Sequence, residues 1–322
     1  MTTLSSLNAL ADTYQLSAEQ RTRLLGFATP TIDPAQQLRL LRRGAGITGM
    51  VLAGVGLICW IAANWHGQSR ATNFVILQCL IVATCGGAFF RHGARPALGM
   101  AALVSIGALL AFFGQTYQSG GDAWQLFALW AGLAVPLCLG VRHDAVWTAW
   151  ALVGLIGVSL AMHESLMAAL HYRTFAPLSF LIAWGLPLLL VFLLGPPARK
   201  FTGAGAWSMR SLVGLTTLMI LEPALKGLFD GADEATWLAF ILLIALGRLF
   251  CEQEWHDTTA LCCIGLSLNV MTFALVAKLF DRHDVSFGAL FAVLGITGAV
   301  MLTATVKFVM LQSRAHAQGA QQ

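Results

Sequence analysis

The sequence predicts an all-α membrane protein that crosses the bilayer about ten times, and three observations lead to this fold class. Hydrophobic residues make up 57% of the 322 residues, and the mean hydropathy is +0.74. Charged residues make up 11%, against about 25% in soluble proteins. From Gly44 onward, continuous apolar runs alternate with short polar breaks. Strands of a membrane barrel would instead alternate at every second residue, so the spans are predicted to be helices.

The first 43 residues are the one stretch of ordinary polarity, and we expect a small cytoplasmic helical hairpin followed by a juxtamembrane helix. They lack the basic start and apolar core of a cleaved signal peptide. The run Ser17-Ala-Glu-Gln20 has the form of a capping box, which predicts the start of the second helix of the hairpin. Asp33 followed by Pro34 predicts the start of the juxtamembrane helix.

Three arginines, Arg39, Arg42 and Arg43, lie at the end of this helix and allow two interpretations. The segment could dock a protein partner or the anionic head groups of membrane lipids. Alternatively, the arginines orient the chain in the membrane and the hairpin is a modest surface cap.

Ten spans follow in residues 44–310, and residues 311–322 are predicted to be a polar cytoplasmic tail. Because some apolar runs are short, nine or eleven spans are alternatives. The spans are expected as successive hairpins, at about residues 44–64, 71–90, 97–114, 123–141, 145–162, 175–194, 208–226, 235–250, 258–279 and 285–310.

The positions of the basic residues predict the orientation of these spans. Fourteen of the 19 Lys and Arg residues fall on the side of the amino terminus when ten spans are counted. Cytoplasmic loops carry the excess of Lys and Arg in membrane proteins. Both termini are therefore predicted to be cytoplasmic.

Polar and aromatic residues gather in the first two outer turns, at the same depth. This arrangement would suit a polar pocket that opens outward between helices. Trp and Tyr at such positions are also typical of the interfacial belt, and Gln and Gly of helix ends, so a structural role is the alternative. The residues concerned are Asn64, Trp65, Arg70, Gln115, Tyr117, Asp122 and Trp124.

Glu222, followed by Pro223, is the acid predicted to lie inside a span. If it faces the outer cluster, it could bind a cation or relay a proton. Alternatively, it pairs with Lys226 one turn later and ends the span at the interface.

No motif for an enzyme, a cofactor, a metal or a nucleic acid is recognised. The seven cysteines include no C-x-x-C pair and lie mostly in apolar runs, as small hydrophobic residues do. His163 and His171, with Glu164, are predicted to lie in the third outer loop, at a spacing that matches no ligand motif. Usual signatures of proteases, esterases and nucleotide-driven pumps are absent from the sequence.

Several motifs resemble a family of bacterial membrane proteins known as domain of unknown function 2157. The resemblance covers about residues 5–160 and implies a bacterial inner membrane, but no activity. The motifs are Ile61-Ala-Ala-Asn64-Trp65, Gly114-Gln115-Thr-Tyr117-Gln118-Ser-Gly120-Gly-Asp122 and Leu126-Phe127-Ala-Leu-Trp130.

Two functions follow as hypotheses. The first is a non-enzymatic inner-membrane protein whose outward polar pocket binds a small molecule, a lipid head group or an envelope partner. The second is a secondary transporter of small solutes, because the length and span number are similar to those of drug/metabolite-type carriers. An intramembrane enzyme is the least favoured alternative.

Overall fold

A computed structural model of the chain describes residues 11–20, 34–63, 69–117, 122–171, 177–231, 233–281 and 287–319. Within these ranges the regular structure is helical and no strand occurs. The all-α prediction is therefore confirmed. The elements are α3 (Pro34–Ala63), α4 (Arg70–Phe90), η1 (His92–Ala94), α5 (Arg95–Tyr117), α6 (Ala123–Val141), α7 (Asp144–His171), α8 (Pro177–Leu194), η2 (Pro196–Ala198), α9 (Arg199–Thr202), α10 (Ala206–Asp230), α11 (Asp233–Cys251), α12 (Thr258–Asp281) and α13 (Phe287–Gly319).

Each predicted span coincides with one of the long helices of the structure. Among the described residues, eight helices are long and apolar enough to cross a membrane, namely α4 to α7 and α10 to α13. Shorter apolar stretches, Gly44–Gly56 of α3 and Ala183–Leu194 of α8, occupy the two remaining predicted spans. The chain is thus a polytopic helical membrane protein.

The chain divides into two compact units, Met1–Gly49 and Met50–Gln322, and α3 runs through the boundary. In the first unit, the Ser17 backbone N–H donates to Gln20 Oε1 at 3.0 Å. The Gln20 backbone N–H donates in return to Ser17 Oγ at 3.3 Å. These reciprocal bonds confirm the predicted capping box. Residues 1–10 and 21–33 of this segment lie outside the described residues.

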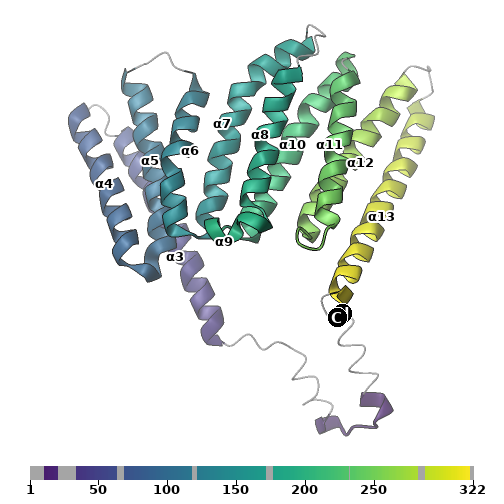
Figure 1. Cartoon of the computed structure of the whole chain (residues 1–322), viewed down its shortest axis with the longest axis horizontal. Helices are drawn as coiled ribbons and strands as arrows, with labels where there is room; N and C mark the ends of the chain where they lie inside the picture. The colour runs from purple at the N-terminus through teal and green to yellow at the C-terminus, as the bar shows by residue number, and fades with distance from the viewer. Residues whose placement is uncertain are drawn as a thin grey trace. The chain divides into compact units, whose positions relative to one another are not determined.

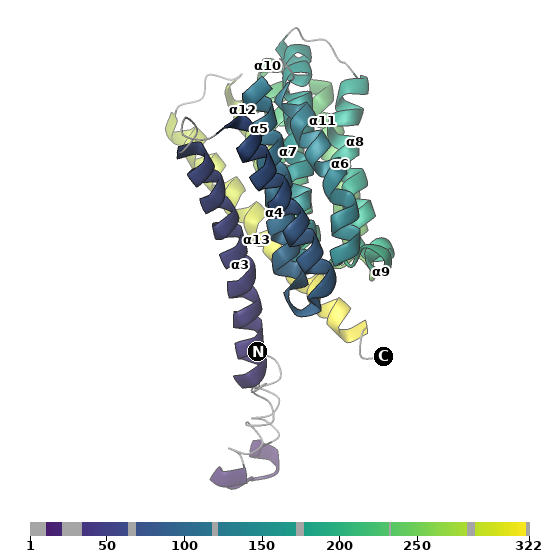
Figure 2. The ribbon, with the colours of Figure 1, turned by 90° about the vertical axis from the view of Figure 1, so that its left-hand side faces the viewer.

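In the second unit, α7 and α10 form the centre of the helical bundle. Helix α7 packs against α5, α6, α8 and α10, and α10 packs against α7, α8, α11 and α12 (Figures 1 and 2). Leu212 and Val213 of α10 are fully buried, in the same apolar core as Trp147 and Ala151 of α7. Predicted hairpin partners such as α5 with α6 and α12 with α13 also pack together. The α7–α10 contact joins helices that are not neighbours in sequence, and the hairpin pattern does not predict it.

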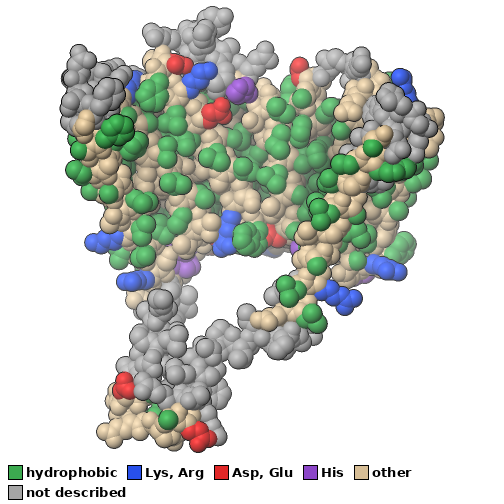
Figure 3. Space-filling model, turned by 180° about the vertical axis from the view of Figure 1, so that it is seen from behind, with side chains coloured by type: hydrophobic (Ala, Val, Ile, Leu, Met, Phe, Trp, Pro, Cys, Tyr) green, Lys and Arg blue, Asp and Glu red, His purple; other side chains and the backbone are tan. Residues whose placement is uncertain are grey.

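One end of this unit carries most of its cations, and we call it the basic end. It contains the connections at residues 91–94, 142–143, 195–205 and 252–257. A space-filling view shows Lys and Arg side chains along this lower margin, below a wide belt of hydrophobic side chains (Figure 3). This distribution is typical of a helical bundle held across a membrane. The other end of the unit is called the opposite end below.

At the basic end, Asp144, the first residue of α7, binds the backbone at the start of α10. Its carboxylate accepts hydrogen bonds from the backbone N–H groups of Gly205, Trp207 and Ser208, each at 2.9 Å. These N–H groups open α10 and have no partner within that helix. Asp144 therefore caps a helix that begins more than sixty residues later. Gly203, with φ +68°, also lets the connection pass close to the backbone of Arg142.

Candidate functional site

The predicted outer residues lie at the opposite end, as far as the structure describes them. Asn64 and Trp65 lie outside the described residues. Arg70 opens α4, while Gln115 and Tyr117 lie in the last turn of α5, and all three are exposed. The Tyr117 ring lies 4.9 Å from Phe113 and 6.1 Å from Phe74, centroid to centroid.

Asp122 and Trp124 lie together at the start of α6. Asp122 occupies the N-cap position, and its Oδ2 accepts a hydrogen bond from Trp124 Nε1 at 3.3 Å. Trp124 is 38% exposed and also lines a cavity between α6, α7 and α8. The binding role of the outer cluster stays a prediction.

Glu222 lies on α10, beside Pro223, and faces α7. Its Oε1 lies 3.9 Å from His163 Nδ1, and both side chains are more than half exposed. With Ser159, Met162 and Met219, among others, they line a small space of about 30 Å³. The structure thus places His163 of a neighbouring helix beside Glu222. The pairing of Glu222 with Lys226 stays a prediction.

The first part of the predicted third outer loop is helical. His163 lies in α7, which continues without a break to His171. Residues 164–170 read Glu-Ser-Leu-Met-Ala-Ala-Leu, a composition rich in strong helix formers. Helical propensity therefore extends the helix beyond the apolar run that marked the predicted span.

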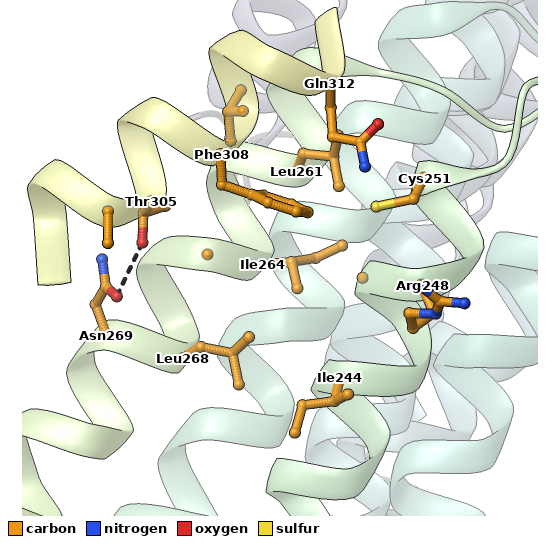
Figure 4. A pocket seen from close by; sticks show the side chains of 14 residues that line it. Ile244, Arg248, Cys251, Leu261, Ile264, Leu268, Asn269, Thr305, Phe308 and Gln312 are labelled. Atoms are coloured by element: carbon orange, nitrogen blue, oxygen red, sulfur yellow. Dashed lines mark hydrogen bonds between the residues drawn. The ribbon is translucent and has the colours of Figure 1, made fainter. Parts of the chain in front are cut away.

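A large cavity lies between α11, α12 and α13 and has a volume of about 460 Å³. Its walls are mostly aliphatic, and Phe308 of α13 lies across it (Figure 4). This volume lies within the range of about 300–1,000 Å³ that is usual for small-molecule sites. The lining residues are Ile244, Gly247, Arg248, Cys251, Leu261, Ile264, Gly265, Leu268, Asn269, Ala304, Thr305, Phe308, Val309 and Gln312.

Polar groups occupy the two ends of this cavity. At the end far from the basic end, Thr305 Oγ1 donates to Asn269 Oδ1 at 3.1 Å, and this hydrogen bond joins α13 to α12 (Figure 4). The Asn269 Nδ2 is buried and has no hydrogen-bond partner among the described residues. Toward the basic end, Arg248 and Gln312 line the cavity. The cavity therefore has apolar walls, with Arg248 at the end near the basic end and the Asn269 amide at the other end.

Contacts beyond Gln312 hold α13 beside the α11–α12 connection. The rings of His256 and His316 stack with centroids 4.3 Å apart, and Thr258 Oγ1 lies 3.2 Å from Ser313 Oγ. Burial lowers the pKa of His256, and the nearby His316 lowers it further. The neutral form of His256 is therefore favoured in the stack.

An ion pair fixes the other side of this connection. Arg210 Nε donates to Asp257 Oδ2 at 2.8 Å, and the carboxylate of Asp257, 7% exposed, also caps α12 by accepting from the Ala260 N–H at 3.0 Å. Arg210 lies over the ring of Trp207, 5.5 Å from its centroid. The bundle is thereby held together at the basic end by polar contacts between α10 and α12.

The part of the chain that the structure describes contains no obvious metal site. There, no group of three or more His, Cys, Asp and Glu side chains is placed to hold an ion. The seven cysteines are free thiols.

Sequence reasoning did not find the cavity between α11 and α13. Arg248 is one of the fourteen Lys and Arg residues counted on the side of the amino terminus, and Asn269 lies within the predicted span 258–279. Gln312 falls in the predicted polar tail, but α13 continues to Gly319. The aliphatic residues that form the walls carry no signal, because lipid-facing and cavity-facing positions have the same composition in a membrane helix.

Comparison with known proteins concerns mainly the first half of the chain. Residues 8–147 match the model of a family described as predicted membrane protein DUF2157. This match confirms the resemblance, and it covers α3 to α6 and the start of α7. No curated protein and no solved structure matches the chain. The helices that form the large cavity lie outside the matched region.

Proposed function

We propose that this membrane protein acts by binding rather than by catalysis, and that its ligand is a membrane amphiphile with an apolar chain and an anionic head group. The site is the cavity between α11, α12 and α13. The observation that carries this proposal is its composition, an aliphatic interior with Arg248 as the charged residue among its lining residues.

The depth of the cavity supports a ligand from one leaflet. Leu261 lies in the first turn of α12, at the basic end, and Asn269 lies eight residues farther along. At 1.5 Å per residue this separation corresponds to about 12 Å. Half of a hydrocarbon core is about 15 Å thick. A chain that follows α12 from Leu261 to Asn269 would therefore cross most of one leaflet.

The charge at the basic end supports an anionic head group. The planar guanidinium of an arginine binds carboxylate and phosphate through paired hydrogen bonds. The Gln312 amide, on the facing helix α13, can donate to the same head group. The excess of Lys and Arg favours a cytoplasmic location for this end, so the ligand would come from the cytoplasmic leaflet of a bacterial inner membrane, with both termini on that side.

The chemistry of the lining supports binding over catalysis. Cys251 and Thr305 are the nucleophilic residues of the cavity, and its lining residues include no His, Asp, Glu or Lys. A nucleophile usually needs such a neighbour as a general base. Thr305 in addition donates its hydroxyl to Asn269.

Native mass spectrometry of the purified protein in mild detergent with phosphatidylglycerol tests this site. Gly247→Leu is expected to remove the bound lipid, because a Cβ at Gly247 has only an ordinary contact, 3.6 Å to Ile264 Cγ2, and the longer side chain would fill the cavity. Arg248→Gln should weaken retention about tenfold, since a hydrogen bond to a charged group contributes about 1.5–3 kcal/mol.

Gly295→Leu is the matched control, because a Cβ there meets no described atom within 4 Å and Gly295 does not line the cavity. If Gly247→Leu retained phosphatidylglycerol as well as Gly295→Leu does, the cavity would not be the site.

A second candidate function, proton-coupled transport, rests on the pair of His163 and Glu222. The pair joins the two central helices at the position where Pro223 interrupts the hydrogen bonding of α10. Ionisable groups that face each other within a bundle can relay protons. The size of the chain, similar to that of drug/metabolite-type carriers, agrees with this alternative.

Uptake of radiolabelled tetraphenylphosphonium into proteoliposomes would examine transport. Uptake driven by a proton gradient is expected to disappear in Glu222→Gln and to persist in part in Glu222→Asp, which keeps the carboxylate. Gradient-driven uptake that is the same in Glu222→Gln and in the unchanged protein would remove Glu222 from the mechanism.

A further inference from the structure

We infer that the cavity between α6, α7 and α8 is a second lipid site, which takes one acyl chain of an ammonium-bearing lipid from the leaflet at the opposite end. The cavity has a volume of about 290 Å³. It shares no helix with the cavity between α11 and α13, so this inference stands or falls separately from the proposed function. Its lining residues are Trp124, Ala128, Ala131, Trp150, Gly154, Gly157, Val158, Ala161, Met162, Leu186 and Leu190.

Small residues create the space. Ala128 and Ala131 of α6 face Gly154, Gly157 and Ala161 of α7 across the cavity. The contact at Gly157 shows how close the two helices come, because a Cβ there would lie 3.1 Å from Phe127 Cβ. Because the lining residues of α6 and α7 beside this contact have small side chains, space remains between these two helices and Leu186 and Leu190 of α8.

Trp150 contributes an apolar surface to the cavity because its one polar atom already has a hydrogen-bond partner. Trp150, 9% exposed, donates its Nε1 hydrogen to the Ala131 carbonyl at 2.8 Å. The ring of Trp150 is thus fixed against α6 and presents carbon to the cavity. A hydrogen-bonding solute would find few partners here, whereas a hydrocarbon chain needs none.

The dimensions favour a chain over a helix of a partner protein. A helix with its side chains is about 10–12 Å in diameter, which a space of about 290 Å³ does not admit. From Trp124 to Ala131 the cavity follows α6 for seven residues, or about 10 Å at 1.5 Å per residue. A segment of an acyl chain matches this length, and the surrounding leaflet supplies such chains.

Carboxylates near the end of the cavity that Trp124 and Met162 line favour a positively charged head group. Trp124 lines the cavity, and its Nε1 hydrogen is bonded to the exposed carboxylate of Asp122 at 3.3 Å. On the α7 side, Met162 borders both this cavity and the small space that contains Glu222. A lipid ammonium group can donate hydrogen bonds to such carboxylates. Charge complementarity therefore distinguishes this end from the end of the other cavity where Arg248 lies.

The test uses the full-length protein in mild detergent with an equimolar mixture of phosphatidylethanolamine and phosphatidylglycerol, followed by native mass spectrometry. Gly154→Leu is expected to lower retained phosphatidylethanolamine about tenfold. A Cβ at Gly154 would lie 3.9 Å from Leu190 Cδ1, an ordinary contact, so the backbone accepts the side chain and the cavity is filled. Gly185→Leu on α8 is the control, because a Cβ there meets no described atom within 4 Å.

Asp122→Asn tests the head group, because the amide oxygen can still accept from Trp124 while the charge is removed. It is expected to reduce the preference for phosphatidylethanolamine over phosphatidylglycerol. If Gly154→Leu and Gly185→Leu retained equal amounts of phosphatidylethanolamine, or if Asp122→Asn left the preference unchanged, the inference would be overturned.

Photocrosslinking supplies a measurement on the unchanged protein, in case Gly154→Leu fails to fold. A phosphatidylethanolamine with a photoreactive group in its acyl chain is expected to label peptides of residues 123–131 and 150–162. Labelling spread evenly over the exposed helices would contradict a built site.

Discussion

Replacement of Asp144 by alanine is expected to lower the free energy of unfolding by about 3 kcal/mol, because three backbone N–H groups lose a charged acceptor at once. These groups belong to Gly205, Trp207 and Ser208 and open α10. The loss of one N-cap typically costs about 1 kcal/mol. Here the cap in addition joins α7 to α10, the two helices at the centre of the bundle.

Asp144→Asn should cost less, about 1–2 kcal/mol, since one amide oxygen can still accept the bonds that Oδ1 accepts from Gly205 and Ser208. Glu252→Ala is the control, because this exposed residue lies at the same end. Unfolding by sodium dodecyl sulfate in mixed micelles, followed by circular dichroism, measures the differences. Equal stabilities for Asp144→Ala and Glu252→Ala would show that the cap does not hold the bundle together.

The second large effect is expected at Gly107 of α5, where leucine should lower the free energy of unfolding by about 3 kcal/mol or prevent folding. Gly107 is buried, and a Cβ there would overlap the indole ring of Trp130. The Trp130 ring cannot easily move aside, because its Nε1 hydrogen is donated at 2.9 Å to the carbonyl of Leu103, which lies on α5 one turn before Gly107. Overpacking is costly where both neighbours are fixed.

Gly132→Leu on α6 serves as the control, because a Cβ at Gly132 meets no described atom within 4 Å. Trp130→Leu should restore part of the stability when it is combined with Gly107→Leu, so the two effects are expected not to add. The measurement is the thermal unfolding midpoint and the monodisperse fraction in size-exclusion chromatography. Additive losses in the double variant would show that Gly107 and Trp130 do not share this space.

The sequence predicted the helices well because a bilayer leaves the chain few choices. Backbone groups in hydrocarbon must bond within the segment, so an apolar run of sufficient length becomes a helix. The predicted span 123–141 and α6 (Ala123–Val141) agree at both ends. Where polar residues follow an apolar run, as after Met162, the end of the run indicates the membrane boundary and not the end of the helix. The helix there continues to His171 because its residues favour helix in water too.

The sites were predicted less well. The outer cluster drew attention because polar residues are rare in such a chain, and of its members Trp124 does line a cavity. The aliphatic walls of the two cavities could not be recognised. On α11, Leu243 is fully buried while its neighbour Ile244 is 54% exposed and lines the large cavity, yet both are ordinary residues of a span.

The sequence alone thus determined the membrane class, the helical fold and the approximate position of each long helix, because hydrocarbon enforces local hydrogen bonding. Only the tertiary structure decided which helices meet. The contact between α7 and α10 depends on one carboxylate, Asp144, that caps a helix distant in sequence. That between α5 and α6 depends on a glycine opposite a tryptophan ring. Both cavities follow from side-chain shapes at such contacts, and shape complementarity between distant helices leaves no periodic pattern in the sequence.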